Sequence, residues 1–159
     1  IVFGDWSSDV CSSDLLRVAA RTGNGRIVVV EEPVPDLAPG MVRLDVKASL
    51  VSPGTELGGG WRALAATRRT PADIPTPLPF GYSNAGVVEA VGGGVAGFRP
   101  GDRVAAVGAG YARHATKAVV PHHLVYRIPE GISFRQASFA MLAATGLQAV
   151  RRQIGSAPV

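Results

Sequence analysis

Cysteine is almost absent from this 159-residue sequence, since Cys11 is the only one. One thiol cannot form an intramolecular disulfide, and it cannot supply the set of cysteines that usually holds a structural zinc ion. Long apolar runs are absent as well, because stretches such as residues 27–30 fall far short of the roughly 20 residues that a membrane-spanning helix needs. The sequence therefore predicts a chain without disulfides, without thiolate metal sites and without a membrane span.

Blocks of like charge and tracts of polar low complexity are also missing, which excludes wholesale disorder. The 20 glycines and 12 prolines show no G-X-Y period, which excludes collagen, and 47% hydrophobic residues suffice for one packed domain. The 16 basic residues are scattered apart from the pairs Arg68-Arg69 and Arg151-Arg152. No recognition helix, RNP string or zinc-finger spacing accompanies them, so we expect no nucleic-acid partner.

Residues 1–15 read IVFGDWSSDVCSSDL and differ from the rest of the sequence. The string repeats Ser-Ser-Asp, has no helical or strand periodicity, and lacks the basic start and apolar stretch of a secretory signal. It resembles translated sequencing-adaptor read-through, and we interpret it as a non-native leader outside the fold. Without its three aspartates, 9 of the 12 acidic residues remain against 16 basic ones, and no cysteine remains.

Short β-prone segments separated by turn residues occupy most of the chain up to residue 132. Residues 41–48 alternate between apolar and charged side chains, as in a strand with one buried face. Thr22-Gly23-Asn24-Gly25 predicts a hairpin turn, and Pro-Gly pairs predict turns at 38–40, 52–55 and 99–102. We expect strands at 16–20, 27–32, 41–48, 86–91, 103–107, 111–120 and 124–128, a pattern typical of a β-barrel or sandwich.

The spacing of the apolar residues changes near the end of the sequence. From Ser133, a candidate N-cap, to Arg152 the apolar residues recur at roughly helical spacing, which predicts one or two helices with Gly146 as a weak point. Residues 155–159 resemble the approach to a further strand, so we expect the protein to continue beyond them. Residues 61–69 fit a short helix or an ordered loop, and the four prolines of 70–79 exclude a long helix.

Two features suggest functional roles that their context does not support. Gly108-Ala109-Gly110 is not a dinucleotide fingerprint, because an expected strand and not a helix follows it. We interpret His114 as a partly buried structural imidazole, and His122 and His123 as surface residues without a third metal ligand.

Five strings occur in a characteristic order: VRLDVKASLVSPGTEL (42–57), PLPFGYSNAGVVEAVGGGVAGFRPGDRV (77–104), YARHATKAVVP (111–121), LVYRIPEGISFRQAS (124–138) and AATGLQAV (143–150). Together they resemble the N-terminal, GroES-like catalytic domain of the medium-chain dehydrogenase/reductase superfamily, which includes zinc alcohol dehydrogenases and zinc-free quinone reductases. The resemblance implies a mainly β fold, with a GroES-like, partly open β-barrel and short helices at residues 16–132. A helical connection at 133–159 would lead toward an absent Rossmann domain.

The sequence departs from the zinc-dependent members of that superfamily at the metal ligands. Where they carry a cysteine after the strand, a Gly-His-Glu string and a further cysteine on the helix, this chain has Ser52 or Pro53, Tyr82 with Ser83, and alanines. Neutral hydroxyls are poor zinc ligands, and a catalytic zinc needs three ligands among Cys, His, Asp and Glu. We therefore expect a zinc-independent member with no metal site. The Ser-Pro-Gly-Thr-Glu-Leu and Gly-Tyr-Ser strings resemble the group that includes bacteriochlorophyllide dehydrogenases.

The resemblance implies hydride transfer with NAD or NADP, in which the protein positions the cofactor and stabilises charge on the substrate oxygen. It places the hydroxyls of Tyr82, Ser83, Ser52 and Thr55 beside the interdomain cleft as candidate catalytic donors, and Thr145 beside the nicotinamide. Structural alternatives stay open for most of them. Tyr82 would pack on the barrel with a backbone partner, Ser52 and Thr55 would cap turns, and Thr145 would bond a preceding helix carbonyl.

The expected function is that of a truncated catalytic domain of a zinc-independent NAD(P)-dependent oxidoreductase, acting on a small alcohol, ketone or quinone-like substrate. The fragment alone should be inactive, because the resemblance puts the dinucleotide-binding domain beyond residue 159. The alternative is a non-catalytic GroES-like barrel that binds a ligand or a protein. We further expect a cytoplasmic location, and a homodimer for the full-length protein.

Overall fold

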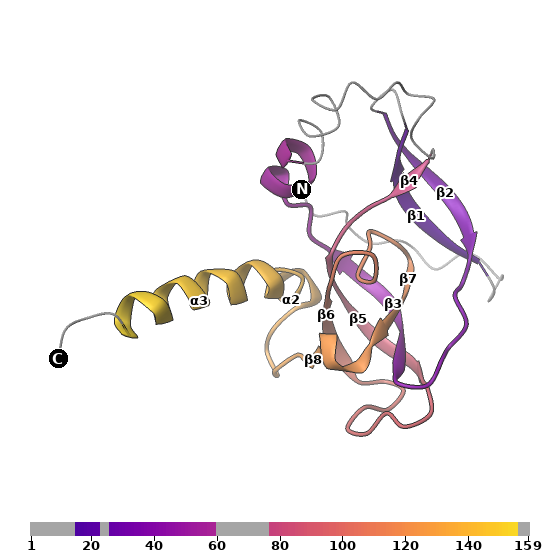
Figure 1. Ribbon diagram of the computed structural model, residues 1–159. Helices are drawn as coiled ribbons and strands as arrows, with labels where there is room; N and C mark the ends of the chain where they lie inside the picture. The colour runs from indigo at the N-terminus through magenta and orange to yellow at the C-terminus, as the bar shows by residue number, and fades with distance from the viewer. Residues whose placement is uncertain (1–14, 23–25, 60–76, 156–159) are drawn as a thin grey trace.

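The computed structural model describes residues 15–22, 26–59 and 77–155, which form two antiparallel sheets (Figure 1). The smaller sheet has the order β2-β1-β4, from β1 (Leu15–Arg21), β2 (Ile27–Pro33) and β4 (Leu78–Pro79). The larger has the order β7-β3-β5-β6-β8, from β3 (Met41–Ser49), β5 (Ser83–Val91), β6 (Arg103–Val107), β7 (Lys117–Pro121) and β8 (Val125–Arg127). The sheet curls into a half-barrel, so the expected mainly β, partly open barrel is confirmed.

Strand β3 shows how the sequence pattern builds the core. Val42, Leu44, Val46 and Ala48 are buried, while the charged residues between them are half-buried or exposed, which confirms the predicted alternation. The buried face packs into one cluster with residues from the four other strands of the larger sheet, among them Val88, Val104, Val120 and Val125. Burying each such side chain contributes about 1.5–3 kcal/mol. The inner face of this sheet is therefore a main source of stability.

The N-terminal hairpin is confirmed in its strands. β1 and β2 pair antiparallel from Leu15 opposite Pro33 to Arg21 opposite Ile27. The predicted turn residues 23–25 lie outside the described residues. The same holds for residues 1–14 of the predicted leader, whereas Leu15 is the first residue of β1. The segment 61–69 and residues 156–159 also lie outside the described residues.

Two of the three predicted Pro-Gly turns are confirmed. Gly40 and Gly101 have φ angles of 78° and 92°, the left-handed conformation that a type II turn requires. The third prediction, at 52–55, is wrong, because the chain there enters the π-helix η1 (Pro53–Gly59). Proline is favoured at the first position of a helix, where a missing N–H leaves no bond unmade. Pro53 therefore starts a helical turn instead of bending the chain back.

The strand predicted at 111–120 is too long, since β7 begins only at Lys117. The residues before it form a loop whose backbone bonds reach both sheets. The Ala19 N–H donates to the His114 carbonyl (2.8 Å), the Thr116 N–H donates to the Arg17 carbonyl, and the Val46 N–H donates to the Thr116 carbonyl (both 2.9 Å). A continuous strand would bond one neighbouring strand on each side within a single sheet. The loop instead fastens β1 to β3.

The N-cap predicted at Ser133 is confirmed as a capping box. Ser133 Oγ accepts from the Gln136 N–H (3.2 Å), and Gln136 Oε1 accepts from the Ser133 N–H (2.9 Å). Two helices follow, α2 (Phe134–Ala137) and α3 (Ala140–Gly155), and α3 runs through Gly146 without a break. α3 projects away from the barrel (Figure 1). In the described part of the chain, no helix combines the length and the apolar character needed to span a bilayer.

Candidate functional site

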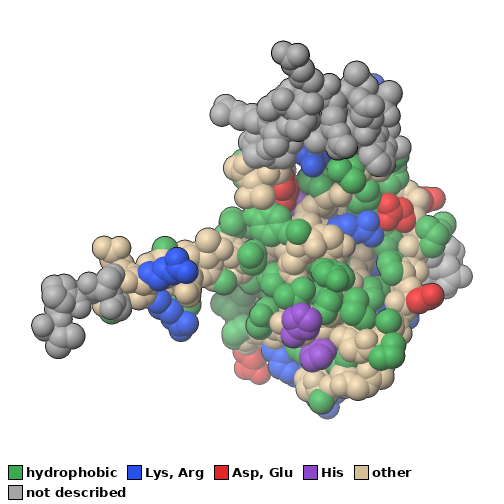
Figure 2. All heavy atoms as spheres, viewed as in Figure 1, with side chains coloured by type: hydrophobic (Ala, Val, Ile, Leu, Met, Phe, Trp, Pro, Cys, Tyr) green, Lys and Arg blue, Asp and Glu red, His purple; other side chains and the backbone are tan. Residues whose placement is uncertain are grey.

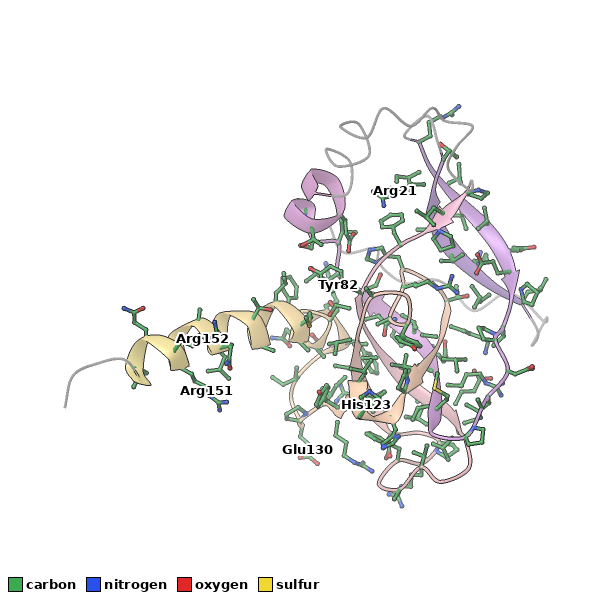
Figure 3. All side chains as sticks on the ribbon, in the orientation of Figure 1. Arg21, Tyr82, His123, Glu130, Arg151 and Arg152 are labelled. Carbon is green, nitrogen blue, oxygen red and sulfur yellow. The ribbon has the colours of Figure 1, made fainter. Side chains whose placement is uncertain are left out.

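The segments that carry the predicted site residues meet at one end of the larger sheet. The Leu50 N–H, just after β3, donates to the Ser83 carbonyl at the start of β5 (3.1 Å). Ser83 Oγ in turn donates to the carbonyl of Ser138, between α2 and α3 (2.7 Å). Figure 3 shows Tyr82 at this end, between η1 and the junction of the two helices. The fold therefore brings η1, the start of β5 and the start of α3 together.

Tyr82 is half-buried immediately before β5. Its carbonyl accepts a hydrogen bond from the Gly108 N–H (2.9 Å). The preceding residue, Gly81, has a φ of 112°, and a Cβ there would lie 2.6 Å from the backbone nitrogen of His114. The backbone of Tyr82 is thus held against the loop that contains His114. The residue as a whole keeps partial access to solvent.

Ser83 does not border an open cleft, contrary to expectation. The residue is fully buried, and its hydroxyl donates to the Ser138 carbonyl. A buried hydroxyl with such a partner is satisfied and links two elements of the fold. Ser83 therefore attaches β5 to the α2–α3 junction, and the candidate donors are Tyr82, Ser52 and Thr55.

Ser52 and Thr55 lie at the start of η1, the first buried and the second exposed. Ser52 Oγ donates to Thr55 Oγ1 over a long 3.4 Å contact, and the Ser52 carbonyl accepts from the Glu56 N–H (2.8 Å). These are bonds of residues that stabilise a helical turn, as in the structural alternative. Because Thr55 accepts from Ser52, its own hydroxyl proton is left for another acceptor.

A buried polar cluster that was not predicted from the sequence lies beside these hydroxyls. His114 Nδ1 lies 2.9 Å from Ser49 Oγ, and His114 Nε2 lies 2.9 Å from Glu56 Oε2. The predicted structural role of His114 fits its 3% exposure and its two bonded ring nitrogens. Its carboxylate partner was not predicted, because Glu56 is 58 residues away in sequence. The one signal was that Glu56 is a lone charged residue in an otherwise uncharged segment.

Thr145 lies in the second turn of α3 and is exposed. Its Oγ1 donates to the Met141 carbonyl (2.9 Å), which is the helical bond of the structural alternative. The residue belongs to an open face of this helix, together with Met141, Ala144, Gln148, Ala149 and Arg152. The hydroxyl oxygen retains lone pairs with which it can accept a ligand's hydrogen bond.

The donors at this end of the sheet do not fit a catalytic zinc. Within residues 15–22, 26–59 and 77–155, no three His, Cys, Asp or Glu side chains come together. Glu56 and His114 are one short of the three ligands that such a zinc needs, and the other groups are neutral hydroxyls. His122 and His123 are exposed on η3 (His122–Leu124), as predicted, and Figure 2 shows histidine side chains at the molecular surface.

A carboxylate with a perturbed pKa lies away from this site. Asp102 Oδ2 accepts from the Arg99 N–H (2.8 Å), and the Arg127 guanidinium bonds both carboxylate oxygens (2.8 and 3.0 Å). These bonds, the Arg99 N–H foremost, hold the pKa of Asp102 below its usual range. Asp102 adjoins the start of β6, whereas Ser83 pairs with Val107 at the other end of that strand. Asp102 therefore supports the fold and not the site.

Comparisons with known proteins agree with the GroES-like fold. A sequence profile of the alcohol dehydrogenase GroES-like domain matches residues 38–130. An L-threonine 3-dehydrogenase from Anaeromyxobacter sp. is 32% identical over 142 residues, covering 72% of this chain and 40% of that protein. The quinone oxidoreductase structure from Pseudomonas syringae has a TM-score of 0.62 at 26% identity, covering 87% of this chain and 41% of that one. The Escherichia coli quinone oxidoreductase, solved with NADPH, has a TM-score of 0.51 at 23% identity, covering 77% of this chain and 36% of that one. This chain thus spans about two fifths of such proteins, or less.

Proposed function

Because this chain belongs to the alcohol dehydrogenase-like, medium-chain dehydrogenase/reductase superfamily and contains its GroES-like domain, we propose that it is the catalytic domain of a zinc-independent, NAD(P)-dependent oxidoreductase. Its substrate would be a small alcohol, ketone or quinone-like molecule. The matching threonine dehydrogenase and quinone oxidoreductases support this assignment by their named activities, and the NADPH in one of them supports the cofactor.

The observation that carries the proposal is the convergence of hydroxyl-bearing segments at one end of the larger sheet. Tyr82 is half-buried there, and Thr55 is exposed on the adjoining η1. Negative charge develops on the oxygen of a carbonyl that receives a hydride, and a hydrogen-bond donor held at that oxygen stabilises it. The residues present offer hydroxyl donors for this task in place of a metal ion.

The roles within this site follow from exposure and geometry. The reduced nicotinamide supplies the hydride when it is bound. We assign Tyr82 as the donor to the carbonyl oxygen, because its phenol hydroxyl can donate a hydrogen bond. Thr55 is the second donor, and Ser52 orients Thr55 through its 3.4 Å contact. Thr145, which is exposed on α3, is assigned a contact with the nicotinamide portion of the cofactor.

We further propose that a dinucleotide-binding domain in the rest of a longer protein completes the enzyme. Helix α3 supports this, because many of its large apolar side chains are exposed: Met141, Leu142, Leu147, Val150 and, at 71%, Ile154. Exposed apolar faces of this kind mark interaction surfaces. The threonine dehydrogenase relative is also much longer than the matched region. On this proposal the 159-residue chain alone does not turn over. A homodimer and a cytoplasmic location stay predictions.

The test uses a complete protein that contains this chain. NADH and NADPH are titrated separately by fluorescence, and oxidation of the one that binds is followed with a panel of aldehydes, ketones and quinones. The zinc content of the same preparation is measured by elemental analysis. Turnover without stoichiometric zinc is the expected result. Failure to bind either cofactor would refute the proposal in favour of a non-catalytic barrel, and one zinc per chain would refute its zinc-independence.

A further inference from the structure

A buried chain of polar side chains lies behind the proposed hydroxyl donors. Ser49 Oγ, the His114 imidazole and the Glu56 carboxylate are joined by two contacts of 2.9 Å, and all three residues are buried. A carboxylate oxygen can accept from His114 Nε2–H, and Nδ1 on the other side of the ring is paired with the Ser49 hydroxyl. Apolar side chains of similar volume would fill this space with less desolvation. The stability of the fold alone therefore does not explain why these three buried side chains are polar.

Glu56 leaves one carboxylate oxygen unpaired within the described residues. Its Oε1 atom is buried and accepts no hydrogen bond there. Leaving a buried acceptor unpaired is unfavourable, more so when it is charged. Local rules of this kind are broken mainly at functional sites, where position matters more than stability.

The imidazole contacts both segments that carry the proposed donors. On one side it bonds Glu56, which directly follows Thr55 on η1. On the other side Gly81, the residue before Tyr82, lies so close that a Cβ there would be 2.9 Å from His114 Cδ2. One side chain therefore links the segments that carry Thr55 and Tyr82.

His114 is itself fixed by contacts around it. Its backbone N–H donates to the Phe80 carbonyl (3.0 Å), and its backbone carbonyl accepts from the Ala19 N–H (2.8 Å). The Phe80 ring packs edge-on against the imidazole, with the ring centres 5.0 Å apart. The ring therefore has little freedom to follow η1 if that segment moves.

We propose that His114 is a positioning residue of the oxidoreductase site. Its imidazole, held by Ser49, fixes Glu56, and Glu56 fixes Ser52 and Thr55 relative to Tyr82. The kinetic consequence rests on the proposed function, whereas the placement of η1 does not.

The kinetic test compares His114→Phe with His123→Phe, a matched control on the exposed η3, in the complete protein. Since misplacement of a reacting group by about 1 Å can cost on the order of 10²-fold in rate, we expect His114→Phe to lower kcat per cofactor-binding site at least ~10-fold. Cofactor affinity should not change. A merely structural histidine would reduce the number of binding sites and leave kcat per site equal to that of the control, and this result would overturn the proposal.

A second pair of variants decides the question if His114→Phe does not fold. Glu56→Gln keeps an oxygen that accepts from Nε2–H, so it should retain kcat within about threefold, whereas Glu56→Ala should lose at least ~10-fold. Equal kcat values per site in the two variants would contradict positioning through this bond.

Amide hydrogen exchange tests the placement of η1 without any turnover. The Glu56 N–H is bonded to the Ser52 carbonyl (2.8 Å), so its exchange reports on the first turn of η1. We expect at least ~10-fold faster exchange there in Glu56→Ala and His114→Phe, but not in His123→Phe. If the complete wild-type protein is inactive, the proposed function is refuted. Faster exchange in its variants would then still support the positioning role. Unchanged exchange would refute the positioning role.

Discussion

Gly81→Ala tests how rigidly the backbone before Tyr82 is held. The added Cβ would lie 2.6 Å from the backbone nitrogen of His114 and 3.0 Å from the carbonyl carbon of Arg113, at a φ of 112°. A left-handed conformation costs a residue with a Cβ about 1–2 kcal/mol, and overpacking costs about 1–3 kcal/mol. The variant should therefore lose about 2–5 kcal/mol of unfolding free energy.

Two control glycines separate these two costs. Gly94 has a φ of 78° but open space around its Cβ position, so Gly94→Ala should lose only about 1–2 kcal/mol. Gly93 has open space and no positive φ, so Gly93→Ala should be neutral or stabilising by about 0.4–1 kcal/mol. Urea unfolding followed by circular dichroism measures all three at a common m-value. A loss in Gly81→Ala no larger than in Gly94→Ala would refute the close approach to His114.

Three further substitutions test the donor, the carboxylate and the cap. Tyr82→Phe should lower kcat of the complete protein about 10²-fold, whereas Tyr126→Phe, at a tyrosine that is 55% exposed, should leave it unchanged; equal rates would exclude Tyr82 as the donor. The lowered pKa of Asp102 means that its carboxylate stabilises the fold above about pH 4, and that this stabilisation is lost as the pH falls through the folded-state pKa. Asp102→Asn should therefore destabilise the protein at pH 7 and progressively less below pH 4 in urea unfolding, and a difference that is independent of pH would contradict the pairing. Ser133→Ala should lose about 1 kcal/mol in the same assay and Ser133→Asn should recover most of it, unless the capping box contributes nothing.

Features that a short stretch of sequence determines by itself could be predicted. The alternation of β3 reports its own burial, and the capping box joins Ser133 to Gln136 three residues later. The loop at 112–116 also alternates, with Ala112 and His114 buried, but its backbone partners lie on β1 and β3. Periodicity cannot reveal that such partners belong to two different sheets.

The sequence predicted which segments form the candidate site better than it predicted the role of each side chain. The resemblance selected Tyr82 and Thr55, which the fold brings to the same end of the larger sheet. The burial of Ser83 depends on the Ser138 carbonyl, 55 residues away, and the pairing of Glu56 depends on His114. One sequence contains no measure of such long-range contacts, so these roles required coordinates.

The loop before β7, which hydrogen-bonds to both β1 and β3, has a consequence for shortened forms of this protein. The family profile begins at residue 38, after the N-terminal hairpin, yet His114 depends on Ala19 of that hairpin for a backbone bond. Trimming the chain to the matched segment would remove the Ala19 N–H that bonds the His114 carbonyl, and with it part of the support of the loop before β7. A shortened form that is meant to keep the barrel intact should therefore include residues 15–33.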